Sequence, residues 1–242
     1  MNLNTLAIKA AKGPNGGAMQ VEDMIRFVLF HGEQAADEID RLQAHYRWPM
    51  DGLLPDGSRV APLGRWTKVC VAFGRNGAVG LVPLLSDEED GSFAAAILEK
   101  VHTPESVEVL LTFCERENSS GWLSPDPMHP VWKAMGALNL LLGLEDYVSV
   151  DASVLDRLRH VVWTRFSHTP IPARQATLIY ALRGAPSRAA LEWLENLKIT
   201  DESLIYARKA CIKSMKSRLA LTHRALNMEE KRQVRKKRAL DV

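Results

Sequence analysis

The acidic turn at residues 87–90 is the first place in the sequence where a metal site could be sought. A calcium-binding loop needs an acidic ligand at its start, a glycine in its middle and a bidentate glutamate at its end. If Gly91 is taken as that glycine, Ser86 occupies the first position and Ile97 the last, so the pattern fails. We expect a solvated turn between helices, with acids near a helix start. The alternative role is contact with a basic partner protein through Asp87, Glu88, Glu89 and Asp90.

The residue types that carry most enzymatic chemistry are present but not in recognisable patterns. The seven histidines form no His-Glu-x-x-His pair, and the chain has neither a Walker-type glycine loop nor a Gly-x-Ser-x-Gly elbow. A pair of acids brought together by the fold stays open. We therefore expect no metal and no cofactor, and we favour a binding role over catalysis. The three cysteines are far apart among apolar residues, which indicates buried thiols in a reducing, cytoplasmic setting: Cys70, Cys114 and Cys211.

The six tryptophans are candidates for the core or for a binding surface. Trp132 and Trp163 lie at positions typical of amphipathic helices, where packing is the expected role. Trp122 differs because it follows Asn118, two serines and a glycine in a stretch typical of a loop. We expect Trp122 to be exposed, and an exposed tryptophan is a natural anchor for a partner.

Charge divides the chain into two halves of opposite sign. Residues 1–150 contain 12 Lys and Arg against 20 Asp and Glu, and residues 151–242 contain 19 against 9. Fields of opposite sign steer partners of opposite charge. The basic run at the carboxyl end forms either a solvated helix or a contact with a nucleic-acid backbone, although it lacks the aromatic residues of a single-strand platform. Its members are Lys231, Arg232, Arg235, Lys236, Lys237 and Arg238.

Hydrophobic spacing predicts helices along most of the chain. Residues 21–46 form one long helix or two short ones with Gly32 as the break, and residues 49–64 form an irregular excursion. Residues 67–73 alternate as a short strand would, but their helical context favours the start of a buried helix. Residues 79–87 resemble residues 107–115 at an offset of 28 positions, with a helix between them. Further helices are predicted at residues 131–142, 154–162, 172–183, 186–197 and 201–221.

The predicted turns contain signals for helix starts. Pro104 and Pro186 fall where a proline suits the first helical position, and Asp151 and Asp201 suit the capping position. The two prolines are 82 residues apart, twice the length of a two-helix repeat unit.

The segments 81–87, 93–98 and 103–111 together resemble the consensus of short HEAT repeats, with an outer helix, an acidic turn and an alanine-rich inner helix. The resemblance covers residues 78–117, and helical rhythm extends it to about residue 220. It implies an all-α fold, a right-handed α-solenoid of HEAT-like helix pairs with an irregular amino-terminal cap. We expect a cap at residues 1–75, the repeat domain at 76–222 and a basic tail at 223–242.

The resemblance also implies a function, because stacked helix pairs offer a concave surface for partners. We expect a bacterial, cytoplasmic protein that binds another protein and has no membrane partner. Small HEAT-like proteins include immunity proteins that mask a toxin, and the acidic half would cover a basic cleft. The alternatives are a nucleic-acid-binding protein or DNA glycosylase of HEAT-like fold, which would use the basic half, and a scaffold or adaptor module. No stretch resembles a signal peptide.

Overall fold

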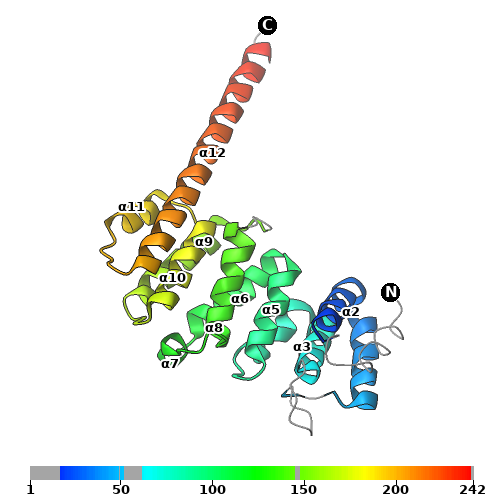
Figure 1. Cartoon of the computed structure of the whole chain (residues 1–242). Coiled ribbons are helices and arrows are strands. Elements are labelled where there is room, and N and C mark those ends of the chain that lie inside the picture. Colours follow the sequence, from blue (N-terminus) through cyan, green and yellow to red (C-terminus); the bar gives the residue numbers. More distant parts are fainter. Residues whose placement is uncertain (1–16, 49, 52–61, 145–147, 241–242) are drawn as a thin grey trace. The chain divides into compact units, whose positions relative to one another are not determined.

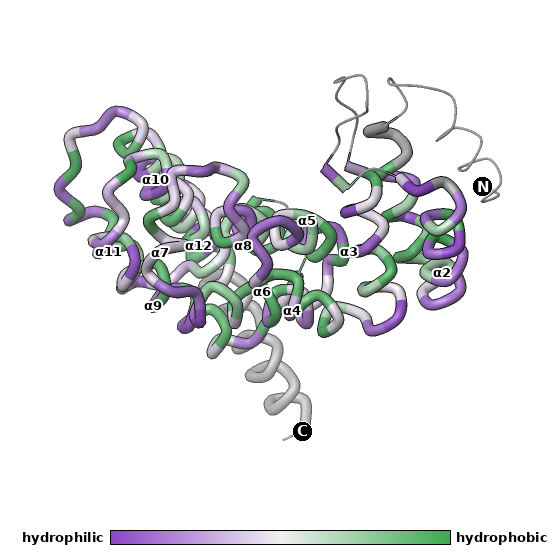
Figure 2. Tube along the Cα trace, turned by 90° about the horizontal axis from the view of Figure 1, so that it is seen from below, coloured by the Kyte–Doolittle hydropathy of each residue, from purple (hydrophilic) through white to green (hydrophobic). Residues whose placement is uncertain are grey.

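The computed structural model describes residues 17–48, 50–51, 62–144 and 148–240, with the side chains of 17–20, 46 and 223–240 left out. All regular secondary structure in these residues is helical, which confirms the all-α class (Figure 1). Hydrophobic and hydrophilic residues alternate along the helices, as amphipathic packing requires (Figure 2). The chain divides into two compact units, residues 1–137 and 138–242, which are described one at a time.

In the described part of unit 1, α2 (Gly17–Tyr46) packs on α3 (Leu63–Asn76). The expected break is confirmed, because Gly32 has φ 53° and ψ −126° and separates two helical stretches within α2. Only glycine adopts such a conformation without strain. On either side of this break, Val28 and Ile39 are each 1% exposed, so both halves of α2 contribute to the core.

The other described elements of unit 1 are η2 (Gly77–Leu81), α4 (Val82–Leu85), α5 (Gly91–Val101), α6 (Pro104–Arg116), α7 (Ser119–Leu123) and the first part of α8 (Pro130–Asn139). The predicted start of α6 is confirmed. Pro104 is its first residue, and the Thr103 hydroxyl accepts from the Ser106 N–H at 3.2 Å. Helices α5 and α6 pack together through fully buried side chains: Ala94, Ile97, Leu98, Val107, Leu110 and Cys114.

The two segments that resemble each other in sequence do not adopt the same structure. Residues 107–115 lie within the 13-residue helix α6, whereas residues 79–87 span a 3₁₀ turn, the 4-residue helix α4 and the turn after it. The 3₁₀ turn η2 folds back on α3, so closely that a Cβ on Gly80 would lie 2.5 Å from the Ala72 main-chain oxygen. This contact with α3 holds the segment in a compact turn instead of a long helix.

Unit 2 contains the end of α8, the π-helical turn η3 (Leu140–Leu144), α9 (Ala152–Phe166), α10 (Pro172–Ala181), η4 (Leu182–Gly184), α11 (Arg188–Asn196) and α12 (Glu202–Leu240). Helix α9 packs on α10, and both α10 and α11 pack on α12. The core is built from side chains that these helices bury completely: Leu158, Leu178, Ile179, Leu194, Ala207, Cys211 and Met215.

Two of the three helix starts predicted in unit 2 are confirmed. Asp151 occupies the capping position of α9, although its side chain makes no capping hydrogen bond, and the Asp201 carboxylate accepts from the Ser203 N–H at 2.9 Å at the start of α12. The expectation that Pro186 opens a helix is wrong. Ser187 caps the helix by accepting from the Ala190 N–H at 3.0 Å, and α11 begins at Arg188, two residues after Pro186, because a serine hydroxyl satisfies a helix-start N–H and a proline ring does not.

Two boundaries expected from the sequence fall inside helices. Residue 75 lies in α3, and residue 222 lies in α12, which is a single helix of 39 residues extending beyond α10 and α11 (Figure 1). Residues 63–85 are long and apolar enough to cross a membrane by length and composition alone. This stretch is not one helix, since it comprises α3, η2 and α4, and Gly77 after α3 has φ 63°.

Candidate partner-binding surface

The acidic turn of unit 1 makes its main contacts within the unit. The Asp90 side chain is 1% exposed, and its Oδ1 accepts from the Arg65 Nη1 at 3.0 Å while its Oδ2 accepts from the Lys68 ammonium. Arg65 also donates to Glu89 at 2.7 Å. The expectation of a fully solvated turn is therefore wrong for Asp90, because two cations of α3 draw its carboxylate into the unit.

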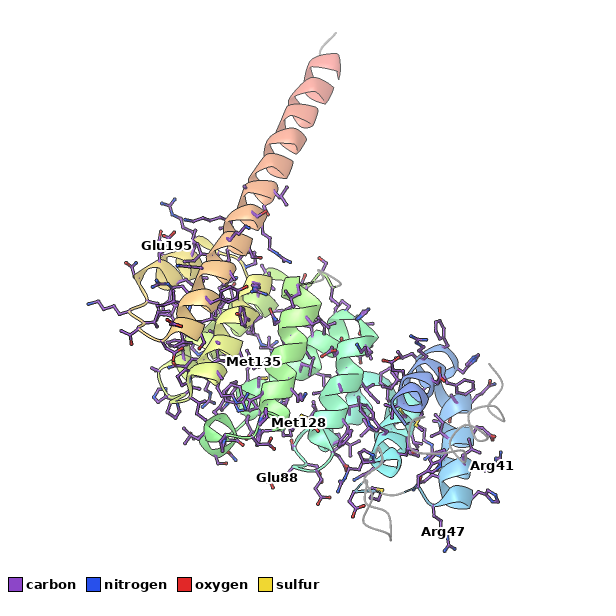
Figure 3. The ribbon with its side chains drawn as sticks, viewed as in Figure 1. Arg41, Arg47, Glu88, Met128, Met135 and Glu195 are labelled. Carbon is purple, nitrogen blue, oxygen red and sulfur yellow. The ribbon has the colours of Figure 1, made fainter. Side chains whose placement is uncertain are left out.

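The other acids of this turn are exposed, and one of them orders the backbone. The Asp87 Oδ1 accepts from the N–H groups of Glu89 and Asp90, each at 2.9 Å, and these bonds hold the pKa of Asp87 below its usual value. Glu88 projects outward from the turn (Figure 3). Only Glu88 among the four acids thus combines exposure with no described polar contact.

Further acids of unit 1 are also paired with cations. Arg75 of α3 bridges Asp37 at 3.0 Å and Asp40 at 2.9 Å on α2, and Arg41 donates to Glu38 at 2.7 Å. The bond from Arg41 lowers the pKa of Glu38. Part of the negative charge that the sequence offered for a basic partner is therefore compensated inside unit 1.

Trp122 is buried, so the expectation of an exposed loop anchor is wrong. Its side chain is 2% exposed and meets Trp132 edge to face, with ring centroids 5.2 Å apart. The cause is local, because the Asn118 side-chain oxygen accepts from the N–H groups of Ser120 and Gly121 and thereby starts the helical turn α7. This turn directs the tryptophan inward, where it packs as the other tryptophans were expected to.

An open pocket beside α12 in unit 2 was missed by the sequence reasoning. It has a volume of about 670 Å³, and we call it the α12 pocket. Its lining combines apolar, cationic and hydroxyl side chains from η3 and α12: Gly143, Leu144, Tyr206, Lys209, Ala210, Lys213, Ser214, Ser217 and Arg218.

The wall of the α12 pocket is fixed by one guanidinium group. Arg218 donates from Nη1 to the Leu142 main-chain oxygen and from Nη2 to the Gly143 main-chain oxygen, both at 2.9 Å. A helix end leaves such carbonyl groups without intrahelical partners. Arg218 therefore ties the end of η3 to α12 and holds Leu144 next to the pocket.

The helix itself divides into a buried face and a pocket face. Leu204, Ala207, Cys211 and Met215 are all buried and face the core of unit 2. Tyr206, Lys213 and Ser217 are exposed and recur at helical spacing on a different side of α12. The exposed fractions of Tyr206 and Leu144, 70% and 52%, are large for apolar side chains that share a pocket.

The lysines of the α12 pocket differ from other cations of unit 2. Lys209 and Lys213 are exposed and have no hydrogen-bond or ion-pair partner among the described residues. By contrast, Lys216 lies 2.7 Å from Glu195 (labelled in Figure 3), and Arg208 donates to the Leu197 main-chain oxygen at 2.7 Å. Among the described residues, the charges of Lys209 and Lys213 in the pocket are therefore not compensated by an acid.

The basic run predicted to contact nucleic acid continues this helix. The backbone of Lys231, Arg232, Arg235, Lys236, Lys237 and Arg238 lies in α12, and their side chains are outside the described part of the chain. Across its 39 residues, α12 contains 12 Lys and Arg against 3 Asp and Glu. The sequence contains the spacing of Tyr206, Lys213 and Ser217 that places them on one side of α12. This side was missed because the basic residues near the carboxyl end were treated as one set.

All three cysteines are buried, as predicted, and none forms a disulfide. Burial raises the pKa of Cys70 and of Cys211 to about 12, which keeps both thiols protonated at neutral pH. Within the residues that the structure describes, no group of three or more His, Cys, Asp or Glu side chains is arranged to hold a metal ion.

Comparison with known proteins adds no relative from which a role could be taken. No protein-family model, no curated protein and no solved structure matches this chain at a significant level.

Proposed function

We propose that this protein acts by binding another protein, and that it contacts an acidic surface of that partner through α12. The observation that carries the proposal is the α12 pocket, where exposed Leu144 and Tyr206 lie beside lysines without described ionic partners. Apolar side chains surrounded by uncompensated charge are typical of surfaces that become buried on association. Such a protein can mask its partner, as an immunity protein masks a toxin.

The sequence favoured a basic partner facing the acidic half of the chain. The pairing of Arg65 with Asp90 and of Arg75 with Asp37 and Asp40 argues against that choice, because these acids already have partners. The lysines of the α12 pocket have none among the described residues. Charge complementarity thus favours an acidic partner.

The fold that accompanies this proposal is an α-solenoid of HEAT-like helix pairs. It is supported by packing between chain neighbours within each unit, α5 on α6 in unit 1 and α9 on α10 in unit 2. The capping box at Thr103 supports it further, since a short turn between paired helices needs a defined helix start. Small-angle scattering tests the proposal, since a solenoid of this length gives a larger radius of gyration than a globule.

Nucleic-acid binding is the second candidate, and the composition of α12 favours it. A helix with 12 basic and 3 acidic residues meets the electrostatic requirement for contact with a phosphate backbone. Against it, no tryptophan is exposed in the part of the chain that the structure describes, which removes the tryptophan platform expected of a base-stacking enzyme.

The two candidates are separated by affinity capture from the source cells with and without nuclease. We expect one protein to be recovered in stoichiometric amount after nuclease treatment, and to be lost when Lys209 and Lys213 are both changed to glutamate. The control is Lys198→Glu, which makes the same kind of substitution, once instead of twice, at an exposed residue of unit 2 outside the α12 pocket. Recovery of chaperones alone, or capture that nuclease abolishes, would contradict the proposal.

A further inference from the structure

The α12 pocket combines three features that point to one kind of ligand. It has two lysines without described partners, hydroxyl groups at Ser214 and Ser217 that make no described hydrogen bond, and exposed apolar side chains. Resting on the proposed function, we propose that this pocket recognises an acidic amphipathic helix of the partner. An apolar side chain of that helix lies between Leu144 and Tyr206, and its carboxylates bind Lys209 and Lys213.

The apolar part of the proposal rests on exposure. Leu144 is 52% exposed at the end of η3, and Tyr206 is 70% exposed on α12. Arg218 holds the η3 end against α12 through two 2.9 Å bonds, so the backbone that positions Leu144 beside the pocket is held before any ligand binds. A rigid apolar site loses less conformational entropy on binding than a mobile one.

The acidic part rests on the spacing of the lysines. Lys209 and Lys213 are four residues apart in α12, so they lie one helical turn apart on the same side. Carboxylates four residues apart on a partner helix have the same separation. Two such pairs form together when the partner helix lies along α12, and this spacing is the signature that the partner segment should carry.

The hydroxyl groups add donors between the charges and the apolar site. Thr222 and Thr177 donate to the main-chain oxygens of the residues four positions before them, Arg218 and Ala173, whereas no such bond is described for Ser214 or Ser217. Serine hydroxyls in a helix often make this backbone bond. At Ser214 and Ser217 the donors stay available to carboxylate oxygens of a ligand.

A helix is favoured over a nucleic acid at this pocket because of its apolar content. A phosphate backbone gains nothing from an exposed leucine, and Tyr206 is a single aromatic residue where base stacking uses several. An amphipathic helix uses both the leucine and the lysines.

The test is fluorescence anisotropy with the full chain and a labelled peptide of about 18 residues, apolar on one helical face and glutamate-rich on the other. The comparison probes are a peptide of the same composition with no apolar face and a single-stranded oligonucleotide of similar charge. We expect the amphipathic peptide to bind at least about tenfold tighter than either. Tyr206→Ala with Leu144→Ser should remove that preference.

The lysine variants complete the experiment. Lys209→Glu with Lys213→Glu should weaken binding of the amphipathic peptide by about tenfold or more, and Lys198→Glu should leave it nearly unchanged. Circular dichroism confirms that each variant is folded. The proposal is overturned if the apolar-pocket variant binds the amphipathic peptide as the parent does, or if the oligonucleotide binds tightest and depends on the same residues.

The peptide-binding experiment and the capture experiment test the pocket and the proposed function separately. If pocket variants fail to affect a partner that is captured intact, the pocket assignment is wrong and the proposed function stands. If the peptide binds at the pocket while no partner protein is captured, the site stands and the proposed function is wrong.

Discussion

Arg65 donates from Nη1 to the Oδ1 of Asp90 at 3.0 Å, across 25 positions of the chain, and the Asp90 side chain is 1% exposed. The contact joins α3 to the start of α5, where Asp90 is the residue before the helix. Such a buried carboxylate is tolerated only when cations and hydrogen bonds replace its water. The pair therefore fixes how the acidic turn sits within unit 1.

Replacing Asp90 should destabilise the protein. Asp90→Ala leaves Arg65, whose side chain is 15% exposed, without its buried acceptor, and removing one partner of a buried pair costs about 3 kcal/mol. Urea unfolding followed by circular dichroism measures this change. The control is Glu89→Ala, because Glu89 is 71% exposed and its pair with Arg65 should contribute less than about 1 kcal/mol. Equal effects of the two substitutions would show that the burial of Asp90 has no energetic importance.

Replacing glycine by alanine should have opposite effects on stability at Gly32, where α2 is kinked, and at Gly136 in α8. Gly32→Ala forces a side chain into φ 53°, ψ −126° and should cost about 1–3 kcal/mol, although the space for a Cβ is open. Gly136→Ala lies within α8 and meets no atom within 4 Å, so it should stabilise the protein by about 0.5–1 kcal/mol. Thermal unfolding of both variants decides the matter, and a stabilising Gly32→Ala would mean that α2 is not kinked there.

Local features of the fold could be predicted from the sequence because their signals are local. Gly32 marked the break in α2, Thr103 and Pro104 marked the start of α6, and Asp201 marked the start of α12. Each of these depends on residues within one helical turn. The spacing of Val131, Met135, Leu138 and Leu142 likewise predicted a buried helical face, and all four are buried.

Features that depend on distant residues could not be predicted in this way. Asp90 sits in a run of acids typical of a solvated turn, and only the packing of α3 brings Arg65 and Lys68 to it. The α12 pocket needs Arg218 to hold the end of η3, a contact across 75 residues.

The buried thiols predict a loss of stability at alkaline pH. Burial raises the pKa of Cys70 and Cys211 to about 12 from an ordinary value of 9.0. Between these values the unfolded chain loses thiol protons that the folded chain keeps, so the free energy of unfolding falls as the pH rises from 9 to 12. At pH 10 each thiol should account for a decrease of about 1 kcal/mol relative to pH 8.

Urea unfolding at pH 8 and pH 10 measures this decrease. The double variant Cys70→Ala with Cys211→Ala should be less stable at both pH values because it leaves cavities, but it should lose the part of the pH dependence that the thiols cause. In the folded protein both thiols should also resist labelling by a thiol reagent until urea is added. Rapid labelling of the native protein would contradict their burial.

The contacts of Arg218 should couple the stability of the protein to the shape of the α12 pocket. Arg218→Met removes both donors to the Leu142 and Gly143 oxygens and should cost about 2 kcal/mol, since bonds from a charged donor contribute more than neutral ones. Lys213→Met, on the same helix but exposed and without a described partner, should change stability by less than about 0.5 kcal/mol. Arg218→Lys should be intermediate because a single ammonium does not match the two-pronged contact of a guanidinium.

The measurement is urea unfolding of the three variants, and hydrogen exchange should show faster opening at residues 140–144 in Arg218→Met alone. If Arg218→Met and Lys213→Met unfold alike, the two 2.9 Å bonds do not hold η3 to α12, and the pocket wall has another cause.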